Sequence, residues 1–378
     1  MSLLVNIGIF FLNILFAIMK LCPVKKKITY ISRQMDSMPL DFQMTIDQFK
    51  KDHPDYQHVV LAKMIHPGLG NKIKYCFHML RQMYHIATSQ AVVLDTYCIP
   101  VSILHQRKSL VVIQMWHALG SFKKFAYSIL DQKEGSSSHI AKLMKMHYHY
   151  TYVLSSSEYA ANHFAEAFHV KREQVKVFPL PKTDLLIDES RKKEIITHIE
   201  ERYPLLKETK KKIIVYAPTF RKTDDHLKEA TEALIHAIDF DHYELVIKLH
   251  PLTSFSIGDS RVIKDDDFTS LEFFHKADII ITDYSAVLFE ALMLDKPLYF
   301  YDFDYDVYMS NRALYIDYKT QMPGVIAEDP EVLMQAIDDE DYDLEKIRAF
   351  KHLMIAPCKK SYTKDFTDFL FAEIEKRA

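Results

Sequence analysis

Two polar motifs end predicted buried strands in the second half of the chain. Val246-Ile247-Lys248-Leu249 forms one predicted buried strand, which His250 and Pro251 end. Residues 278–282 form another around Ile279-Ile280-Ile281, and the polar cluster Thr282-Asp283-Tyr284-Ser285 breaks it before a predicted helix. Ligands of parallel sheets bind at the carboxyl ends of the strands, and the free N–H groups of a helix start attract anions. The two motifs therefore predict a phosphate or diphosphate site. The alternative is that Ser285 only caps a helix and His250 only ends a strand.

A third strand end carries a histidine in the first half of the chain. Residues 111–116 lead into His117, and Lys123 and Lys124 follow shortly after it. The near-neutral pKa of histidine suits it to remove a proton from an alcohol. We predict that His117 faces the ligand and that the two lysines hold anionic groups of an acceptor. The alternative is a core histidine followed by a solvated loop.

A fourth strand end supplies an arginine. Residues 214–217 lead into a turn fixed by Pro218, which would project Thr219 and Arg221 from the sheet. The forked guanidinium group of arginine matches the oxygen atoms of a phosphate. We predict that Thr219 and Arg221 reach the same anion, with an exposed surface arginine as the alternative.

Strands and helices alternate along the chain, which is typical of parallel sheets with helices on both faces. The first predicted strand series is 27–33, 58–62, 91–95, 109–116, 152–155 and 174–178, and the second is 212–217, 243–249, 262–263, 278–282 and 298–301. Predicted helices include 139–149, 158–168 and 191–202. The sequence therefore predicts an α/β protein with two doubly wound, Rossmann-like domains that face a cleft.

The predicted organisation has five parts. These are an apolar N-terminal segment (1–27), a first domain (28–182), a linker (183–210), a second domain (211–355) and a C-terminal helix (356–378).

Composition argues against several classes of protein. The chain holds only 7 glycines in 378 residues, and it lacks both the GxGxxG fingerprint and a P-loop. Its 4 cysteines show no CxxC spacing and its 19 histidines are scattered, so we expect neither structural disulfides nor a zinc site. Residues 1–182 carry 22 Lys and Arg against 11 Asp and Glu, whereas the remainder carries 26 against 40. Without a nucleic-acid motif, this basic half favours an anionic membrane surface over nucleic acid.

The N-terminal segment is the first candidate for membrane contact. Residues 3–19 are almost wholly apolar, and Lys20 and residues 25–27 add lysines directly after them. At 1.5 Å per residue such a helix spans about 25 Å, which is marginal for a bilayer. Three interpretations remain: a short anchor with the lysines on the cytoplasmic side, a helix in the interface, or a helix packed on the protein's own core. Residues 71–86 mix basic and apolar side chains, and they are either a second lipid-facing surface or an ordinary domain helix.

The order of these motifs resembles one enzyme family. The motifs that carry the resemblance are Trp116-His117-Ala118 with Lys123 and Lys124, Ala217-Pro218-Thr219-Phe220-Arg221, Lys248-x-His250-Pro251, Ile281-Thr282-Asp283-Tyr284-Ser285 and Lys296-Pro297. In this order they resemble the CDP-glycerol glycerophosphotransferases of teichoic acid synthesis. The resemblance implies a GT-B-type architecture, with residues 28–182 as the acceptor-binding, membrane-facing domain and residues 211–355 as the CDP-polyol-binding domain. It also implies a peripheral enzyme on the cytoplasmic side of the cell membrane of a Gram-positive bacterium.

The same resemblance implies roles for individual residues. His117 would be the base for the acceptor hydroxyl, and His250 would contact the donor diphosphate. The remaining substrate-binding residues that it implies are Lys123, Lys124 and Lys182, together with Thr219, Arg221, Lys248, Thr282, Asp283, Ser285, Ala286 and Glu290. Among these, Arg221 and Ser285 would contact phosphate, Thr282 and Asp283 would shape the turn, and Glu290 would face the ribose.

Two positions depart from the family pattern. Ala286 stands where a second serine is usual, so a hydroxyl is missing although the backbone N–H remains. Leu180-Pro181-Lys182 stands where Gly-x-Pro-Arg is usual, so Lys182 offers a point charge in place of a fork.

We therefore predict a transferase that moves glycerol phosphate, or another polyol phosphate, from CDP-glycerol or CDP-ribitol to an acceptor on a lipid carrier, undecaprenyl diphosphate, and releases CMP. Developing negative charge would be offset by Arg221, His250 and the helix after Ser285. We expect no metal or cofactor, because Asp302 and Asp304 follow a strand where they would shape a loop. The alternatives are a GT-B glycosyltransferase or epimerase that uses a nucleotide sugar, and a binding module without catalysis.

Overall fold

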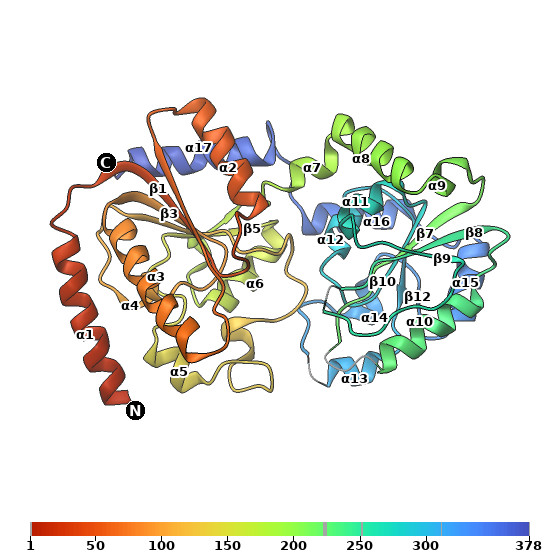
Figure 1. Cartoon of the computed structure of the whole chain (residues 1–378), viewed down its shortest axis with the longest axis horizontal. Helices are drawn as coiled ribbons and strands as arrows, with labels where there is room; N and C mark the ends of the chain where they lie inside the picture. The colour runs from red at the N-terminus through yellow and green to blue at the C-terminus, as the bar shows by residue number, and fades with distance from the viewer. Residues whose placement is uncertain (1, 222–224, 251, 311, 378) are drawn as a thin grey trace. The chain divides into compact units, whose positions relative to one another are not determined.

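The computed structural model describes residues 2–221, 225–250, 252–310 and 312–377, and the chain divides into two compact units. Unit 1 comprises Met1–Lys182 and Ala356–Ala378, and unit 2 comprises Thr183–Ile355. Each unit contains one parallel sheet of six strands (Figure 1). The α/β class and the two doubly wound units predicted from the sequence are confirmed.

The elements of unit 1 are α1 (Ser2–Met19), β1 (Lys25–Ser32), α2 (Leu40–Asp52), β2 (Gln57–Ala62), α3 (Leu69–Ala87), β3 (Ser89–Leu94), α4 (Ile99–Ile103), β4 (Val111–Gln114), η1 (Ala126–Ile129), α5 (Ser138–Leu143), β5 (Tyr152–Ser155), α6 (Glu158–Phe168), η2 (Arg172–Gln174), β6 (Val175–Val177) and α17 (Tyr362–Glu375).

The sheet of unit 1 has the order β2-β1-β3-β4-β5-β6, and helices cover both of its faces. Alternate side chains of β1 point in opposite directions, as in any strand. Tyr30 packs on Phe42 of α2 with ring centroids 5.3 Å apart, whereas Ile31 joins a core cluster that includes Phe16 of α1 and Met83 of α3. α17, from the end of the chain, lies beside α2 (Figure 1).

α1 is attached to unit 1 along one face. Phe16 is 1% exposed in the core cluster, and Ile9, Leu12 and Met19 pack against the same cluster at helical spacing. Asn13 receives a hydrogen bond from His105 N–H at 2.8 Å and donates one to Ile103 O at 3.2 Å. Among the described helices, α1 is the one that is long and apolar enough to cross a membrane, by length and composition only.

The elements of unit 2 are α7 (Thr183–Ile187), α8 (Glu189–Arg202), α9 (Leu205–Glu208), β7 (Lys212–Tyr216), α10 (Asp225–Ala237), β8 (Tyr243–Ile247), β9 (Val262–Lys264), α11 (Ser270–Lys276), β10 (Ile279–Thr282), α12 (Leu288–Leu292), β11 (Leu298–Tyr301), α13 (Tyr305–Met309), α14 (Tyr318–Gln321), β12 (Ile326–Ala327), α15 (Pro330–Asp338) and α16 (Leu344–Met354).

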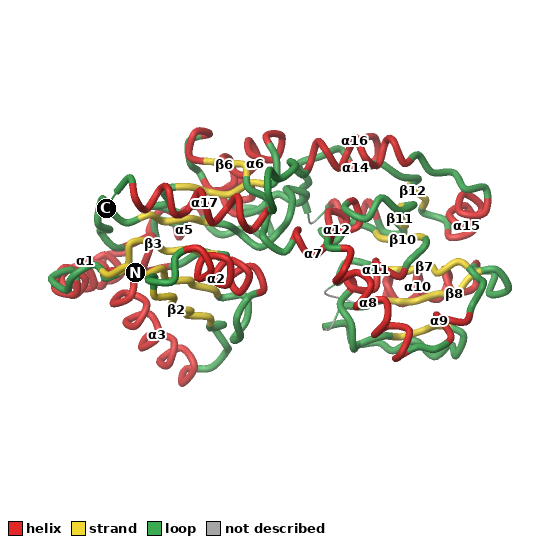
Figure 2. Tube along the Cα trace, turned by 90° about the horizontal axis from the view of Figure 1, so that it is seen from above, coloured by secondary structure: helices red, strands yellow, loops and turns green. Residues whose placement is uncertain are grey.

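The sheet of unit 2 has the order β12-β11-β10-β7-β8-β9. Figure 2 shows these strands stacked from β12 at the top through β11, β10 and β7 to β8. Every residue of β8 and β10 is buried, because a parallel sheet covered by helices on both faces hides both sets of side chains.

Three predicted segments differ from the structure. Residues 183–210 are not a linker: they form α7, α8 and α9 and belong to unit 2, where the side chain of Asp188 caps α8 by accepting from the N–H groups of Ser190 and Arg191. The helix predicted at 139–149 ends at Leu143, because the left-handed backbone of Lys145, His147 and His149 cannot continue a right-handed helix. The helix predicted after Ser285 begins only at Leu288 and is 5 residues long.

Candidate active site

The candidate site of unit 2 lies where its strand order reverses. Read from β7 as the first strand, the order is that of a dinucleotide-binding fold, whose ligands bind at the carboxyl ends of the two central strands, here β7 and β10. Thr219, after β7, donates from its N–H and its hydroxyl to Oδ1 of Asp283, after β10, at 2.8 and 2.6 Å. Thr282 is fully buried and donates to Ala217 O at 2.8 Å. Thr282 and Asp283 thus join the two loops.

Arg221 lies inside unit 2 rather than at its surface. It is 8% exposed, and its guanidinium donates to Asp283 at 2.9 Å, to Asp304 at 2.8 and 2.9 Å, and to Thr219 O at 2.7 Å. Four of its five N–H groups are therefore occupied. Burial alone would lower the pKa of Arg221, but Asp283 and Asp304 outweigh burial and raise that pKa.

This geometry does not favour the expected phosphate contact of Arg221, because two carboxylates and the Thr219 carbonyl accept from four of its five N–H groups. Asp304 is one of the two acidic residues that we expected to shape a loop, and it does so by holding Arg221. The other, Asp302, pairs with Lys319.

The ammonium group of Lys248 likewise donates its hydrogen bonds within the protein. It is 6% exposed, and its ammonium donates to Asp265 O and Phe268 O, each at 2.6 Å, and to the carboxylate of Asp265. An ammonium has three N–H groups, so Lys248 retains none for a substrate. Burial would raise the pKa of Asp265, but the hydrogen bonds from Lys248 and Tyr203 lower it. Lys248 therefore fixes the end of β8 instead of binding a ligand.

His250 and Ser285 remain accessible at this edge of the sheet. His250 is exposed, and its ring lies 5.1 Å from that of Phe220, which connects the loop after β8 to the loop after β7. Nδ1 of His250 accepts from Leu252 N–H at 3.2 Å, which makes Nε2 the nitrogen that carries the proton in the neutral ring. Pro251, which was expected to end this strand together with His250, lies outside the described residues.

Ser285 is half-buried before α12, and its hydroxyl accepts a long hydrogen bond of 3.4 Å from Val287 N–H. This hydrogen bond is partly what the capping alternative predicted, because the Ser285 hydroxyl accepts from an N–H group just before α12. Ala286 is exposed, and Glu290 is half-buried in α12. Among the described residues, no hydrogen bond is recorded for the backbone N–H groups of Ser285 and Ala286.

The candidate site of unit 1 also lies at a reversal of strand order, between β1 and β3. His117 follows β4, and its Nδ1 lies 2.9 Å from the carbonyl oxygen of Asp95, directly after β3. A carbonyl can only accept, so Nδ1 carries the proton and Nε2 presents its lone pair. Nε2 lies 3.1 Å from the amide nitrogen of Gln34, which follows β1. Three strand ends thus orient one imidazole as a base.

Its surroundings keep His117 neutral. The residue is exposed, yet the protein atoms around its ring desolvate it and so lower its pKa. The hydrogen bond to Asp95 O opposes that shift, and the charge of Lys182 adds to it. Lys182 is therefore close enough to His117 to act on its charge. Lys123 and Lys124 are half-buried, and the charge of Lys124 adds to the burial that lowers the pKa of His163 on α6.

Trp116 holds this histidine in place at a conformational cost. Its φ of 62° is left-handed, which is strained for a bulky side chain. The indole ring stacks on Phe125 at 4.7 Å and 14°, and it lies 4.1 Å from the ring of His117. Backbone strain of this kind is concentrated at functional sites, where packing enforces it.

Comparison with known proteins identifies the family. The family model described as CDP-Glycerol:Poly(glycerophosphate) glycerophosphotransferase matches residues 14–360. The chain belongs to this family. It is 32% identical over 361 residues to a teichoic acid ribitol-phosphate primase of Bacillus spizizenii, covering 93% of this chain and 92% of that one. It is 30% identical over 366 residues to a teichoic acid glycerol-phosphate primase of Bacillus subtilis, covering 92% of each chain.

A solved structure of the wall teichoic acid polymerase TagF shares the fold, with a TM-score of 0.72 at 22% identity, over 94% of this chain and 90% of that one. The resemblance inferred from the sequence motifs is confirmed. The alternative of a glycosyltransferase that uses a nucleotide sugar is not favoured.

Two residues of the candidate site were not predicted from the sequence. Gln34 and Asp95 meet His117, although neither belongs to a motif that carried the family resemblance. Asp95 is 4% exposed, and burial raises its pKa to about 6, against the opposing hydrogen bonds of Ser32 and Thr96. Both residues stand at the ends of predicted strands, 27–33 and 91–95. Polar residues at the carboxyl ends of parallel strands commonly face the ligand, and this signal, which points to His117, points to Gln34 and Asp95 as well.

Proposed function

We propose that this chain transfers a polyol phosphate from a CDP-polyol to a hydroxyl of a teichoic acid precursor on a prenyl diphosphate carrier. The observation that supports it best is His117, whose Nδ1 lies 2.9 Å from the Asp95 carbonyl oxygen and whose Nε2 is the basic nitrogen, contacted at 3.1 Å by the Gln34 amide that an acceptor hydroxyl would displace. Nε2 takes the proton of the acceptor hydroxyl, and the oxygen attacks the polyol-bearing phosphorus of the donor. The bond from that phosphorus to the bridging oxygen breaks, and CMP leaves with that oxygen.

The donor diphosphate is assigned to the loops after β7, β8 and β10. His250, Thr219 and the backbone N–H groups of Ser285 and Ala286 lie at this edge, and Glu290 stands in the following helix. These loops are held in shape from within by Thr282, Asp283, Arg221 and Lys248. The buried charged groups therefore position the donor-binding loops and do not contact the donor themselves. On the acceptor side, Asp95 Oδ1 is buried and has no hydrogen-bond partner among the described residues.

Radiolabelled CDP-glycerol and CDP-ribitol, each with a synthetic lipid-linked acceptor, test the proposal. We expect equimolar CMP and a phosphodiester product with one of the two donors, because both primases named above are of the same family. A parallel reaction with a UDP-sugar serves as the control. Formation of a glycoside there, with no phosphodiester from either CDP-polyol, would overturn the assignment.

We further propose that unit 1 lies on the cytoplasmic membrane surface of a Gram-positive cell, and that α1 does not span the bilayer. One face of α1 is packed on the core, whereas Leu3, Leu4, Phe10 and Phe11 are 62–74% exposed on it. A helix tied to its domain along one face presents only the other face to lipid. Lys20 and Lys25 are basic residues at its end, suited to anionic headgroups.

Leu4→Glu combined with Phe11→Glu is expected to weaken binding to phosphatidylglycerol vesicles by at least about tenfold, because two apolar side chains no longer enter lipid. Leu205→Glu is the matched control, since Leu205 is 51% exposed on unit 2. Vesicle sedimentation measures the change. Deleting residues 1–27 is a poorer test, because it removes Asn13 and Phe16 from unit 1. Retention of the intact protein after carbonate extraction would instead favour a spanning helix.

A further inference from the structure

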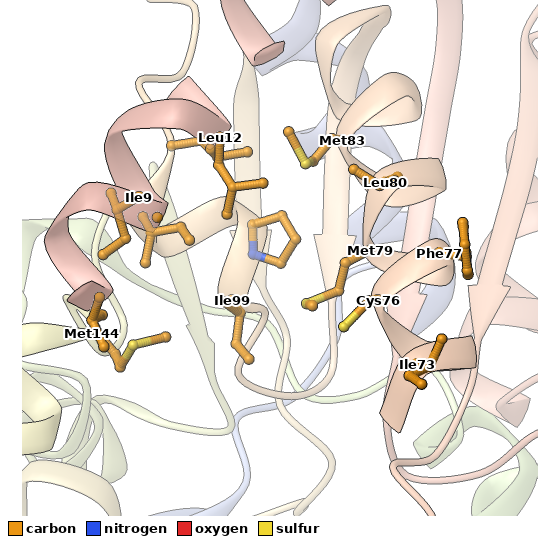
Figure 3. A pocket seen from close by; sticks show the side chains of 15 residues that line it. Ile9, Leu12, Ile73, Cys76, Phe77, Met79, Leu80, Met83, Ile99 and Met144 are labelled. Carbon is orange, nitrogen blue, oxygen red and sulfur yellow. The ribbon is translucent and has the colours of Figure 1, made fainter. Parts of the chain in front are cut away.

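An apolar cavity of about 590 Å³ lies within unit 1, between α1 and α3, with α4 between them (Figure 3). Figure 3 shows Ile9 and Leu12 of α1 on one side and Leu80 and Met83 of α3 on the other. Among the described residues, the lining contains no charged side chain and no side-chain oxygen or nitrogen. A polar ligand buried there would lose its hydrogen bonds to water without replacement, so the cavity suits a hydrocarbon.

The volume of this cavity and the adaptable side chains in its walls suit a flexible hydrocarbon chain. Its volume lies within the range of about 300–1,000 Å³ that small-ligand pockets occupy. Met79, Met83 and Met144 contribute to the walls, and methionine adapts its shape to irregular hydrocarbon surfaces. Ile73 and Phe77 also line the cavity and are 51% and 69% exposed, so it opens at the surface along α3. Lys72 and Lys74 are exposed on the same stretch, where they match an anionic lipid.

The cavity is connected to the candidate base by a short segment. Asp95, whose carbonyl orients His117, precedes the wall residue Ile99 by four positions, which span at most about 14 Å. Between them, Tyr97 donates its hydroxyl hydrogen to the carbonyl of Met144 at 3.0 Å, and Met144 is another wall residue. A ligand with an apolar tail in the cavity would therefore have its head near the strand ends of unit 1.

We propose that this cavity binds part of the prenyl chain of the lipid-linked acceptor and thereby presents the acceptor hydroxyl to His117. The inference rests on the proposed function, because it takes the chain to be that of the acceptor. Proximity to the base favours the acceptor over a bulk membrane phospholipid, which has no need to lie near a catalytic group.

Gly8 provides a way to fill the cavity without disturbing the fold. It lines the cavity from α1, and a Cβ built on it meets no atom within 4 Å. Gly8→Leu should therefore occupy the space, while Gly8→Ala is the matched control that alters helix propensity with little filling. We expect Gly8→Leu to raise the KM for a long-chain prenyl acceptor by at least about tenfold. The KM for an acceptor with the same head and no chain, and that for CDP-glycerol, should stay at the wild-type and Gly8→Ala values.

Protection of Cys76 from a thiol reagent by a bound prenyl chain is measured without catalytic turnover. It therefore separates failure of this inference from failure of the proposed function. Cys76 is exposed and lines the cavity, whereas Cys22 is half-buried elsewhere and serves as the internal reference. We expect geranylgeranyl diphosphate to slow maleimide modification of Cys76, relative to Cys22, in wild type and Gly8→Ala but not in Gly8→Leu. Peptide mass spectrometry measures the rates. Absence of protection in wild type, or protection that persists in Gly8→Leu, would overturn the inference. Equal protection by phosphatidylglycerol micelles would reassign the cavity to membrane lipid.

Discussion

His117→Ala is expected to lower turnover by about 10²–10⁴-fold, the usual effect of losing a general base. Affinity for the CDP-polyol should stay nearly unchanged, because the residues assigned to the donor are on unit 2 and His117 is on unit 1. Initial rates with radiolabelled donor give turnover, and calorimetric titration with CDP-glycerol gives affinity. His250→Ala is the contrasting variant, since it should weaken donor binding by about tenfold.

The pH profile gives the His117 assignment a second readout. The pKa of His117 is below its ordinary value, so the neutral, basic form is present at pH 7 and is lost only on acidification below the ordinary pKa. The acid limb of kcat/KM should therefore lie below pH 6.5. Lys182→Ala removes a positive charge that lowers this pKa and should move the limb upwards, whereas Lys182→Arg should leave it in place. Substantial activity in His117→Ala would transfer the role to another group, with Asp95 the first to test.

Arg221→Met is expected to reduce the free energy of unfolding by about 3–5 kcal/mol, because it leaves buried carboxylates without their partner. Asp283 is fully buried, and Arg221 is the cation that pairs with both Asp283 and Asp304, whereas Thr219 adds only neutral hydrogen bonds to Asp283. Urea unfolding followed by circular dichroism measures the loss. Fluorescence of Trp116, the single tryptophan, reports on unit 1 in the same samples.

Arg261→Met is the matched control for Arg221. Arg261 pairs with Asp259 at 2.7 Å, but its side chain is 53% exposed, and such pairs contribute about 0–1 kcal/mol. Combining Arg221→Met with Asp304→Asn should recover part of the lost stability, since one unpaired charge is removed. If the Arg221→Met protein is as stable as wild type and is defective only in CDP-glycerol binding, the original prediction that Arg221 contacts the phosphate directly would be supported.

The sequence located the strand ends more reliably than it predicted what the side chains do there. β5 and β11 coincide with the predicted 152–155 and 298–301, because continuous apolar runs bounded by polar residues are distinctive. The positions of Arg221 and Lys248 in sequence are equally distinctive, but their partners Asp304 and Asp265 are brought to them only by the fold. A cation after a strand could therefore face a ligand or a buried carboxylate, and the sequence alone does not distinguish the two.

Local backbone conformation was the other source of error. The apolar and aromatic residues at 139–149 suit a helix, yet three left-handed residues end it early, and none of them is a glycine that would have signalled the turn. The short helix α12 differs for a related reason, since Ser285 and Ala286 form a turn that accepts from Leu288 and Phe289 before the helix begins. Tertiary packing can impose such conformations against the preference of the residues involved.

The return of the chain to unit 1 affects the order in which the protein can be completed on the ribosome. Unit 2 is continuous, whereas unit 1 is closed by α17, whose Phe366 and Leu370 are fully buried and whose Phe371 stacks on His53 at 3.6 Å. Synthesis proceeds from the N-terminus, so the whole of Thr183–Ile355 emerges before the helix that covers this face of unit 1. Until then, the apolar surface around Phe49 and Tyr56 lacks the ring of Phe371 that packs on it in the finished protein.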